Sequence, residues 1–267
     1  MRSNLKNKYC ITSENLIQYA INTSNKKRGD FQIGKFGIIV FSNYLLEYFK
    51  DKLNLNTNDW LAPFHPYSSG QIHNGIYEDF SISIIMPSMG ASPIASIAED
   101  MINCGAKSLF LVCGAWGIAN NVKLLDFLVP THAIGPDGTS IYYGRDLNEE
   151  TIINKLVADK IINETKKRTK NYHVGKNYSI EAFYKIKIEK VKELQKKNVI
   201  SMENGELNTL TTICNQRNVR FGAIFYNYFN PLKPWKVPWF EEEYKKCVEL
   251  EGKIILAVIK SLAEEIE

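Results

Sequence analysis

Residues Gly90–Gly117 read GASPIASIAEDMINCGAKSLFLVCGAWG, the pattern of a loop, a helix and a buried strand in succession. Ser92-Pro93 is a typical helix start, and apolar residues then recur at helical spacing until Asn103. Ser108–Cys113 is a short apolar run of the kind that forms a strand covered on both faces. This unit therefore predicts a helix packed on a sheet.

The same alternation of apolar runs and helical periods continues on both sides of this unit. It predicts an α/β fold, and no linker or repeat divides residues 1–267, so we expect a single domain. Ligands in such folds bind where strands end and helices begin. The predicted strands are Phe36–Phe41, Phe80–Met86, Ser108–Cys113, Asp126–Val129, Tyr172–Tyr178, Val199–Met202 and Arg220–Tyr226. The predicted helices are Asn43–Lys52, Ser92–Asn103, Glu149–Thr169, Lys185–Lys197, Gly205–Gln216 and Glu241–Ile266.

The composition is that of an ordinary globular protein. The chain has 267 residues, of which 45% are hydrophobic and 23% charged, and its formal net charge is +4. These values exclude a disordered chain. The basic runs at residues 166–170 and 185–197 fit solvated helix faces, so we expect no nucleic-acid partner.

The cysteines and the hydropathy pattern further narrow the class of protein to which the chain can belong. The 5 cysteines are scattered and form no C-x-x-C pair, so we expect neither a disulfide framework nor a metal site. The first residues lack an apolar signal region, and no stretch approaches the roughly 18 apolar residues that span a membrane. We therefore expect a cytoplasmic protein without a membrane partner.

Three loops after predicted strands could carry chemistry. The small-residue loop Pro87–Pro93 leads into a helix, whose free N–H groups suit an anion or a sugar hydroxyl. The glycines of Cys113–Gly117 would let the backbone approach a ligand, or would form a turn beside a packed tryptophan. In Ser201–Glu206, the Glu203 carboxylate could accept two hydrogen bonds from a vicinal diol such as ribose, or it could cap the helix.

Taken together and in order, these loops resemble the nucleoside phosphorylase and uridine phosphorylase superfamily. The resemblance extends over roughly residues 35–229 and is that of a divergent member. The segments that carry it are Gly90–Gly117, similar to the family's G-x-x-SP-x-A … G-A-K … F-x-R-V-G-T-x-G; Asp137–Tyr143, similar to DGTS-x-x-Y; His173–Gly175; Ala182–Tyr184; and Ser201–Glu206, similar to E-M-E-x-x-A.

The resemblance implies a fold and an activity. The fold would be a three-layer αβα sandwich around a central mixed, partly barrel-like sheet. The activity would be that of a glycosyltransferase (pentosyltransferase) that cleaves the N-glycosidic bond of a nucleoside, with phosphorolysis to the base and ribose 1-phosphate as the family default. Phosphate would be a co-substrate, no cofactor would be needed, and the chain would form a homodimer or a hexamer built from dimers.

The resemblance also assigns roles to individual residues. Met202 and Glu203 match the residues that hold the ribose, and Glu203 is the candidate catalytic residue. Phe183 matches the aromatic on which the base stacks, although a core aromatic would look the same. Lys185 lies where uridine phosphorylases begin a Gln-x-Arg, and Asn227 lies where purine enzymes place an acid. Because asparagine can bind a base but cannot protonate it, the base specificity stays open.

The phosphate side departs most from the family pattern. The family's Gly-Asp-Pro-x-Arg loop reads Ser42–Leu46, its F-x-R-V-G arginine is Val112, and its threonine is Ala115. Both cationic groups and the hydroxyl are missing, and each charge-assisted hydrogen bond to phosphate is worth about 1.5–3 kcal/mol. Gly90, Ala115 and Arg145 remain candidates for the phosphate or water side, and Arg145 could supply a cation or lie on the surface.

These departures leave alternatives to phosphorolysis open. The protein could be a hydrolytic nucleosidase in which Glu203, His65 or His73 orients water. It could also be a non-catalytic nucleoside-binding protein, or it could cleave nucleotides with Arg145 or Lys187 on a 5′-phosphate. The proline- and tryptophan-rich segment 231–240 would be a lid over the base pocket, part of a subunit interface, or a rigid connector.

Overall fold

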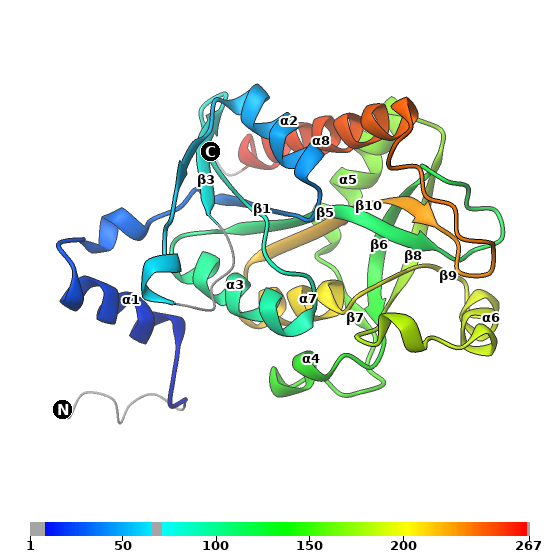
Figure 1. Ribbon diagram of the computed structural model, residues 1–267, viewed down its shortest axis with the longest axis horizontal. Helices are drawn as coiled ribbons and strands as arrows, with labels where there is room; N and C mark the ends of the chain where they lie inside the picture. Colours follow the sequence, from blue (N-terminus) through cyan, green and yellow to red (C-terminus); the bar gives the residue numbers. More distant parts are fainter. Residues whose placement is uncertain (1–8, 66–70, 266–267) are drawn as a thin grey trace.

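The computed structural model describes residues 9–65 and 71–265, and it places helices on both faces of one 10-stranded sheet (Figure 1). The strands are β1 Phe36–Val40, β2 Asn56–Asn58, β3 Ile72–Tyr77, β4 Phe80–Ile85, β5 Ser108–Gly117, β6 Phe127–Ile134, β7 Thr151–Ile152, β8 Tyr172–Ser179, β9 Val199–Glu203 and β10 Arg220–Phe229. The α-helices are α1 Ser13–Thr23, α2 Asn43–Leu53, α3 Ala91–Asn103, α4 Gly138–Tyr142, α5 Lys155–Arg168, α6 Ile188–Lys196, α7 Glu206–Gln216 and α8 Glu242–Ala263. Short 3₁₀ turns lie at Arg28–Phe31, Ala62–Phe64 and Phe183–Lys185.

The sheet is mixed and partly closed. Its strand order is β10-β6-β8-β9-β5-β1-β4-β3-β2, and an additional parallel pairing of β10 with β5 joins strands that are far apart in that order. Strands β5, β9, β8, β6 and β10 therefore form a ring, from which β1, β4, β3 and β2 extend as an open sheet. The expected mixed, partly barrel-like sheet is confirmed.

Side chains of the central strands alternate between two hydrophobic cores. Ile39 and Leu111 pack on the face covered by α3 and α7, whereas Ile38 and Val112 pack on the face covered by α2, α5 and α8 (Figure 1). Successive side chains of a strand point to opposite faces, so one apolar run contributes to both cores. The expected three-layer αβα arrangement is confirmed.

Two boundaries differ from the sequence expectations in ways that matter for the site. Cys113–Gly117 is not a loop, because β5 continues through it to Gly117. Its glycines are needed for packing: a Cβ at Gly114 would lie 2.8 Å from the ring of Tyr226. The helix expected from Glu149 begins only at Lys155, because the Asn154 side chain accepts the N–H of Val157 and caps it there.

The core face of α8 contains a buried acid outside any site predicted from the sequence. Glu251 is fully buried, and neither of its carboxyl oxygens has a hydrogen-bond partner within residues 9–65 and 71–265. Burial raises the pKa of Glu251 well above its ordinary value of 4.5. The folded protein therefore keeps a proton on Glu251 at a pH where the unfolded chain has lost it.

We expect Glu251→Gln to remove part of the pH dependence of stability. The pKa of Glu251 is higher in the folded protein than in the unfolded chain. The contribution of Glu251 to wild-type stability is therefore greatest below pH 4.5, and it is lost as pH rises through the folded-state pKa. Glutamine keeps the shape but does not ionise. Urea unfolding at pH 5 and pH 8 should show that the variant gains stability relative to wild type over this interval. Parallel pH profiles for the two proteins would contradict the assignment of a buried, protonated Glu251.

Candidate functional site

The candidate site lies where the N-termini of α3 and α7 meet the ends of β4, β5 and β9. Gly90 follows β4 and precedes α3, and Glu203 ends β9 just before α7. The two helix starts are in contact, because a Cβ at Gly205 would lie 3.0 Å from the Cβ of Ala91. Both glycines have positive φ angles, of 112° for Gly90 and 97° for Gly205, which an L-residue rarely adopts. Two positive helix ends thus converge on one small region.

Glu203 is held by hydrogen bonds to both of its carboxylate oxygens. Its Oε2 accepts the backbone N–H groups of Glu206 (2.7 Å) and Leu207 (3.2 Å), and so caps the start of α7. Its Oε1 accepts the Asn177 side-chain amide at 3.1 Å and the Ser179 hydroxyl. A carboxylate offers about four lone-pair sites, so these donors use all of them. The two alternatives foreseen for Glu203, a helix cap and a diol acceptor, therefore share one side chain.

Glu206 is the site residue that the sequence reasoning missed. Its side chain is 4% exposed, and its Oε1 accepts the backbone N–H of Gly90 at 2.7 Å. No side chain at the start of α3 itself caps that helix, and Glu206 reaches across from α7 to do so. The signal in the sequence was the glutamate at the last position of Ser201–Glu206, where the family pattern E-M-E-x-x-A has alanine.

Glu203 and Glu206 form a carboxyl pair. Burial raises the pKa of Glu203 well above its ordinary value of 4.5, and a hydrogen bond and charge repulsion from Glu206 add to the rise. Two neighbouring carboxylates without a cation cannot both stay ionised. Charge on Glu203 is therefore opposed by burial and by Glu206, and it is favoured by the two helix N-termini.

Aromatic rings lie next to this pair. Met202 pairs with Trp116 across β9 and β5 and is 1% exposed, so it is buried under the aromatic residues. The rings of Trp116 and Phe183 have centroids 4.4 Å apart, and Trp116 donates its indole N–H to the Tyr228 hydroxyl at 2.8 Å. Phe183 is partly buried, so it is neither a free stacking platform nor a fully buried core residue.

The remaining base-side candidates lie in different environments. Lys185 is exposed on the 3₁₀ turn after Phe183. Asn227 is 1% exposed, and the chain's own backbone uses its amide: Oδ1 accepts the N–H of Gly117 at 2.7 Å, and Nδ2 donates to the Lys123 carbonyl at 2.8 Å. In this geometry Asn227 fastens β10 to β5.

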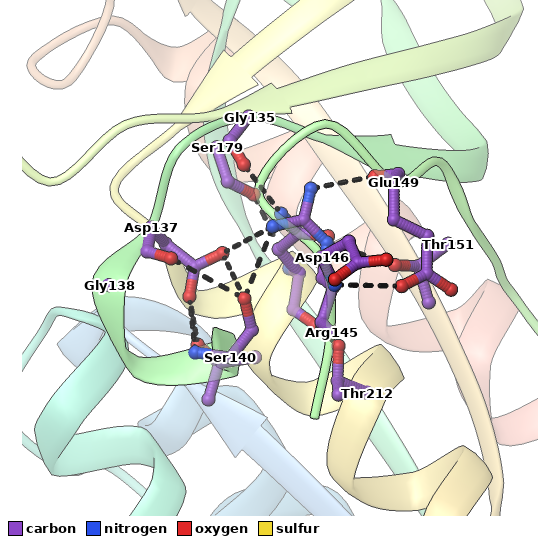
Figure 2. Close-up of polar contacts among 12 residues, drawn as sticks. Gly135, Asp137, Gly138, Ser140, Arg145, Asp146, Glu149, Thr151, Ser179 and Thr212 are labelled. Carbon is purple, nitrogen blue, oxygen red and sulfur yellow. Dashed lines mark hydrogen bonds and ion pairs between the residues drawn. The ribbon is translucent and has the colours of Figure 1, made fainter. Parts of the chain in front are cut away.

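Arg145 lies in the buried polar cluster that Figure 2 shows. Its side chain donates to Thr151 Oγ1 (3.2 Å), Ser140 Oγ (3.3 Å) and the Glu149 carbonyl (2.7 Å). Its Nη1 is 3.7 Å from Asp137 Oδ2. The expectation of a surface arginine is wrong, because Arg145 is 3% exposed. The guanidinium instead holds the turn between β6 and β7 through these contacts.

The comparisons with known proteins match this geometry. The family model described as the phosphorylase superfamily matches residues 35–260. The chain belongs to the phosphorylase superfamily. Two solved structures of uridine phosphorylase from Vibrio fischeri ES114, one of them complexed with 6-hydroxy-1-naphthoic acid, superpose with a TM-score of 0.73 at 17% sequence identity. Each match covers 87% of this chain and 93% of the other, and at this identity the likeness concerns the fold. No curated protein matches the chain significantly.

Within this superfamily member, the phosphate side carries no cation at the positions that the sequence resemblance singled out. Val112 and Ala115 are buried in the two hydrophobic cores. Ser42 accepts the N–H of Leu45 to cap α2 and contacts the Tyr244 hydroxyl at 3.0 Å. Gly90 is the one candidate of this side that contacts the carboxyl pair.

The histidines proposed to orient water lie elsewhere in this superfamily member. His73 is on β3, where its Nδ1 is 2.7 Å from Thr57 Oγ1 on the edge strand β2. The charges that act on it come from Lys50 and Glu47 of α2, on the face of the sheet opposite α3 and α7. His65 follows the turn Ala62–Phe64 and lies near Asp100. The hydrogen bond given for His73 is thus to Thr57 and not to the carboxyl pair.

The segment 231–240 of this superfamily member lies against the aromatic residues of the site. Trp235 packs on Phe229 with centroids 4.5 Å apart, and Trp239 packs on Tyr228 at 5.6 Å. Trp235 is nevertheless 60% exposed and Phe240 95% exposed. The segment thus borders the proposed base side and presents aromatic surface to solvent, as either a lid or an interface segment would.

The described residues contain neither a candidate metal centre nor a candidate membrane span. No group of three or more histidine, cysteine, aspartate or glutamate side chains there is placed to hold a metal ion. None of the helices in the same residues is long and apolar enough to cross a membrane.

Proposed function

We propose that this protein cleaves the N-glycosidic bond of a nucleoside, a glycosyl-transfer activity of the phosphorylase superfamily type. The observation that carries the proposal is the Glu203 carboxylate, fixed by two backbone N–H groups at the end of β9 beside Met202. A carboxylate in that position can accept the hydroxyls of a ribose while it remains anchored to the start of α7. Superfamily membership supports the same reaction class.

The geometry supports the following roles for the site residues. The ribose hydroxyls take the places of the Asn177 and Ser179 side chains on Glu203 Oε1, and the backbone donors keep Oε2 in position. The base lies against the aromatic rings of Trp116 and Phe183. When the bond to the base breaks, positive charge develops at C1′ of the ribose, and negative charge on the carboxyl pair stabilises it.

Water is the acceptor that the site favours over phosphate. Phosphorolysis needs cationic groups on a dianionic co-substrate, and the positions of the family's arginines hold Val112 and the loop after Ser42. Arg145 does not replace them, because its donors are engaged with Thr151, Ser140 and Glu149. The proposed activity is therefore that of an N-glycosyl hydrolase built on a phosphorylase fold.

A second candidate function rests on a specific observation. All lone-pair sites of Glu203 are already used within the chain, so a nucleoside must displace internal hydrogen bonds to bind there. A protein that binds nucleosides without cleaving them would tolerate this arrangement.

Three further features also stay proposals. They are the homodimer or dimer-based hexamer, the role of segment 231–240 as a lid or interface, and the cytoplasmic location.

The proposed function predicts base release from at least one nucleoside without added phosphate. Purified protein is incubated with purine and pyrimidine nucleosides and their 5′-monophosphates, each with and without inorganic phosphate, and base, free ribose and ribose 1-phosphate are separated by chromatography. We expect base and free ribose in equal amounts, at a rate independent of phosphate. Saturable binding by calorimetry without base release would instead establish the nucleoside-binding function, and neither binding nor release would exclude both.

A further inference from the structure

The strongest unexplained feature of the site is the position of Glu206. It lies on α7, yet its carboxylate accepts the N–H of Gly90 at the start of α3, at 2.7 Å. A helix N-terminus attracts anions, and here the chain supplies its own. An external anion that approached the start of α3 would have to displace the Glu206 carboxylate from that N–H. It would also be repelled by the negative charge of the carboxylate.

A second feature next to Glu206 points to a small hydrogen-bond donor as the ligand of this position. The side-chain oxygen of Asn204 is buried and has no hydrogen-bond partner among the described residues. Its amide nitrogen would lie 4.0 Å from a Cβ placed at Gly90, so Asn204 borders the same backbone position as Glu206. A buried acceptor without a donor costs free energy unless a ligand or water satisfies it. A water molecule beside Glu206 is a donor small enough to satisfy Asn204 Oδ1.

We propose that Glu206 is a catalytic residue that takes the place of an anionic co-substrate and deprotonates the attacking water. The proposal rests on the proposed function and deepens it. The water oxygen forms a bond to C1′ of the ribose as the bond from C1′ to the base nitrogen breaks, and the bonding electron pair leaves with the base. One proton of the water goes to the Glu206 carboxylate and then to solvent. The departing base takes a proton from solvent, so the products are free ribose and the neutral base.

The arrangement also explains why the charge at this position comes from a carboxyl pair. Glu203 caps α7 and Glu206 caps α3, so the two carboxyl groups face both helix N-termini. A phosphate dianion would bring further negative charge to the same place, and no described cation contacts Glu206 to offset it. Water brings no charge. The acceptor is thus selected by repulsion of anions as well as by the loss of the family's arginines.

Two substitutions at Glu206 test the proposal in the full-length protein. Glu206→Gln keeps a carbonyl oxygen for the Gly90 N–H but removes the base, and we expect phosphate-independent base release to fall at least about 100-fold. Glu206→Ala restores the family's alanine and uncovers the Gly90 N–H. We expect the same fall, together with a new phosphate-dependent release that yields ribose 1-phosphate. Glu189→Gln, at an exposed glutamate in the first turn of α6, is the matched control and should keep the wild-type rate.

A binding measurement separates failure of this proposal from failure of the proposed function. Inorganic phosphate is titrated calorimetrically into wild type and Glu206→Ala, after circular dichroism has shown that both are folded. Saturable binding by the variant and none by wild type supports the proposal even where no nucleoside is cleaved. The proposal is overturned if wild type itself binds phosphate or forms ribose 1-phosphate, or if Glu206→Gln retains the wild-type rate. If Glu206→Ala does not fold, the Glu206→Gln rate and its phosphate titration decide.

Discussion

Replacing Glu203 with alanine is expected to lower kcat/KM for nucleoside cleavage by at least about 100-fold, the usual loss when a group that stabilises transition-state charge is removed. The substitution removes the proposed acceptor of the ribose hydroxyls and half of the carboxyl pair. At about 1.36 kcal/mol per tenfold change in rate, the loss corresponds to about 2.7 kcal/mol of transition-state stabilisation or more. Steady-state kinetics on the best substrate of the nucleoside panel measures it.

Stability must be followed in the same experiment, because Glu203 is also structural. Alanine leaves the N–H groups of Glu206 and Leu207 and the side chains of Asn177 and Ser179 without their acceptor. Each buried donor left unpaired costs about 1–3 kcal/mol, so the melting temperature should fall. Glu203→Gln, which keeps the volume, is the second variant, and assays well below both melting temperatures separate folding from catalysis. A folded Glu203 variant with wild-type turnover would falsify the assignment of Glu203 to the ribose.

The architecture was largely predictable from the sequence because buried strands and amphipathic helices leave strong local patterns. The strand at Ser108–Cys113 and the helix after Gly90 were both found, and their order predicted an α/β fold. Closure of the sheet was not visible in these patterns. It depends on β10 pairing with both β5 and β6, a long-range choice that no local period records.

Elements with weak patterns were missed for physical reasons. Helix α1 is mostly polar and buries chiefly Ile17 and Ala20, so it gave no clear apolar face. Strand β3 pairs with β4 as a hairpin around Glu78, whose positive φ is favourable only for a few residue types, and the segment Ile72–Tyr77 contains a histidine, an asparagine and a glycine. In both cases tertiary packing overrides a local sequence that favours no single structure.

The candidate site was predictable in part. Glu203 and Met202 could be placed at a strand end because strand ends and helix starts can be read from the sequence. The partnership of Glu206 with Gly90 could not, since it links residues 116 positions apart through a contact between two helix ends. Asn227 and Arg145 were candidates by residue type alone. Both side chains are buried and make hydrogen bonds within the chain, and these contacts give them structural roles.

Replacing Arg145 with methionine is expected to destabilise the fold by about 3–5 kcal/mol, the cost of removing one partner of a buried ion pair. Asp137 is fully buried, and Arg145 is the cation that the structure places near it, at 3.7 Å. Asp137 also accepts the N–H of Ser140 and the hydroxyl of Thr209, which hold the turn to α7. Without the guanidinium, the Asp137 charge is left uncompensated in the protein interior (Figure 2). Urea unfolding of the single variant measures the loss.

The double variant Arg145→Met/Asp137→Asn separates the ion pair from simple packing. Asparagine removes the buried charge but keeps an oxygen for Ser140 and Thr209, so the double variant should recover a large part of the stability that Arg145→Met loses. The kinetic consequence is equally specific. Because the donors of Arg145 are used by Thr151, Ser140 and Glu149, it holds no co-substrate, and the folded double variant should cleave nucleosides at the wild-type rate with and without phosphate. A stable double variant that has lost activity would instead show that Arg145 acts in the site, as the cation that the phosphate side otherwise lacks.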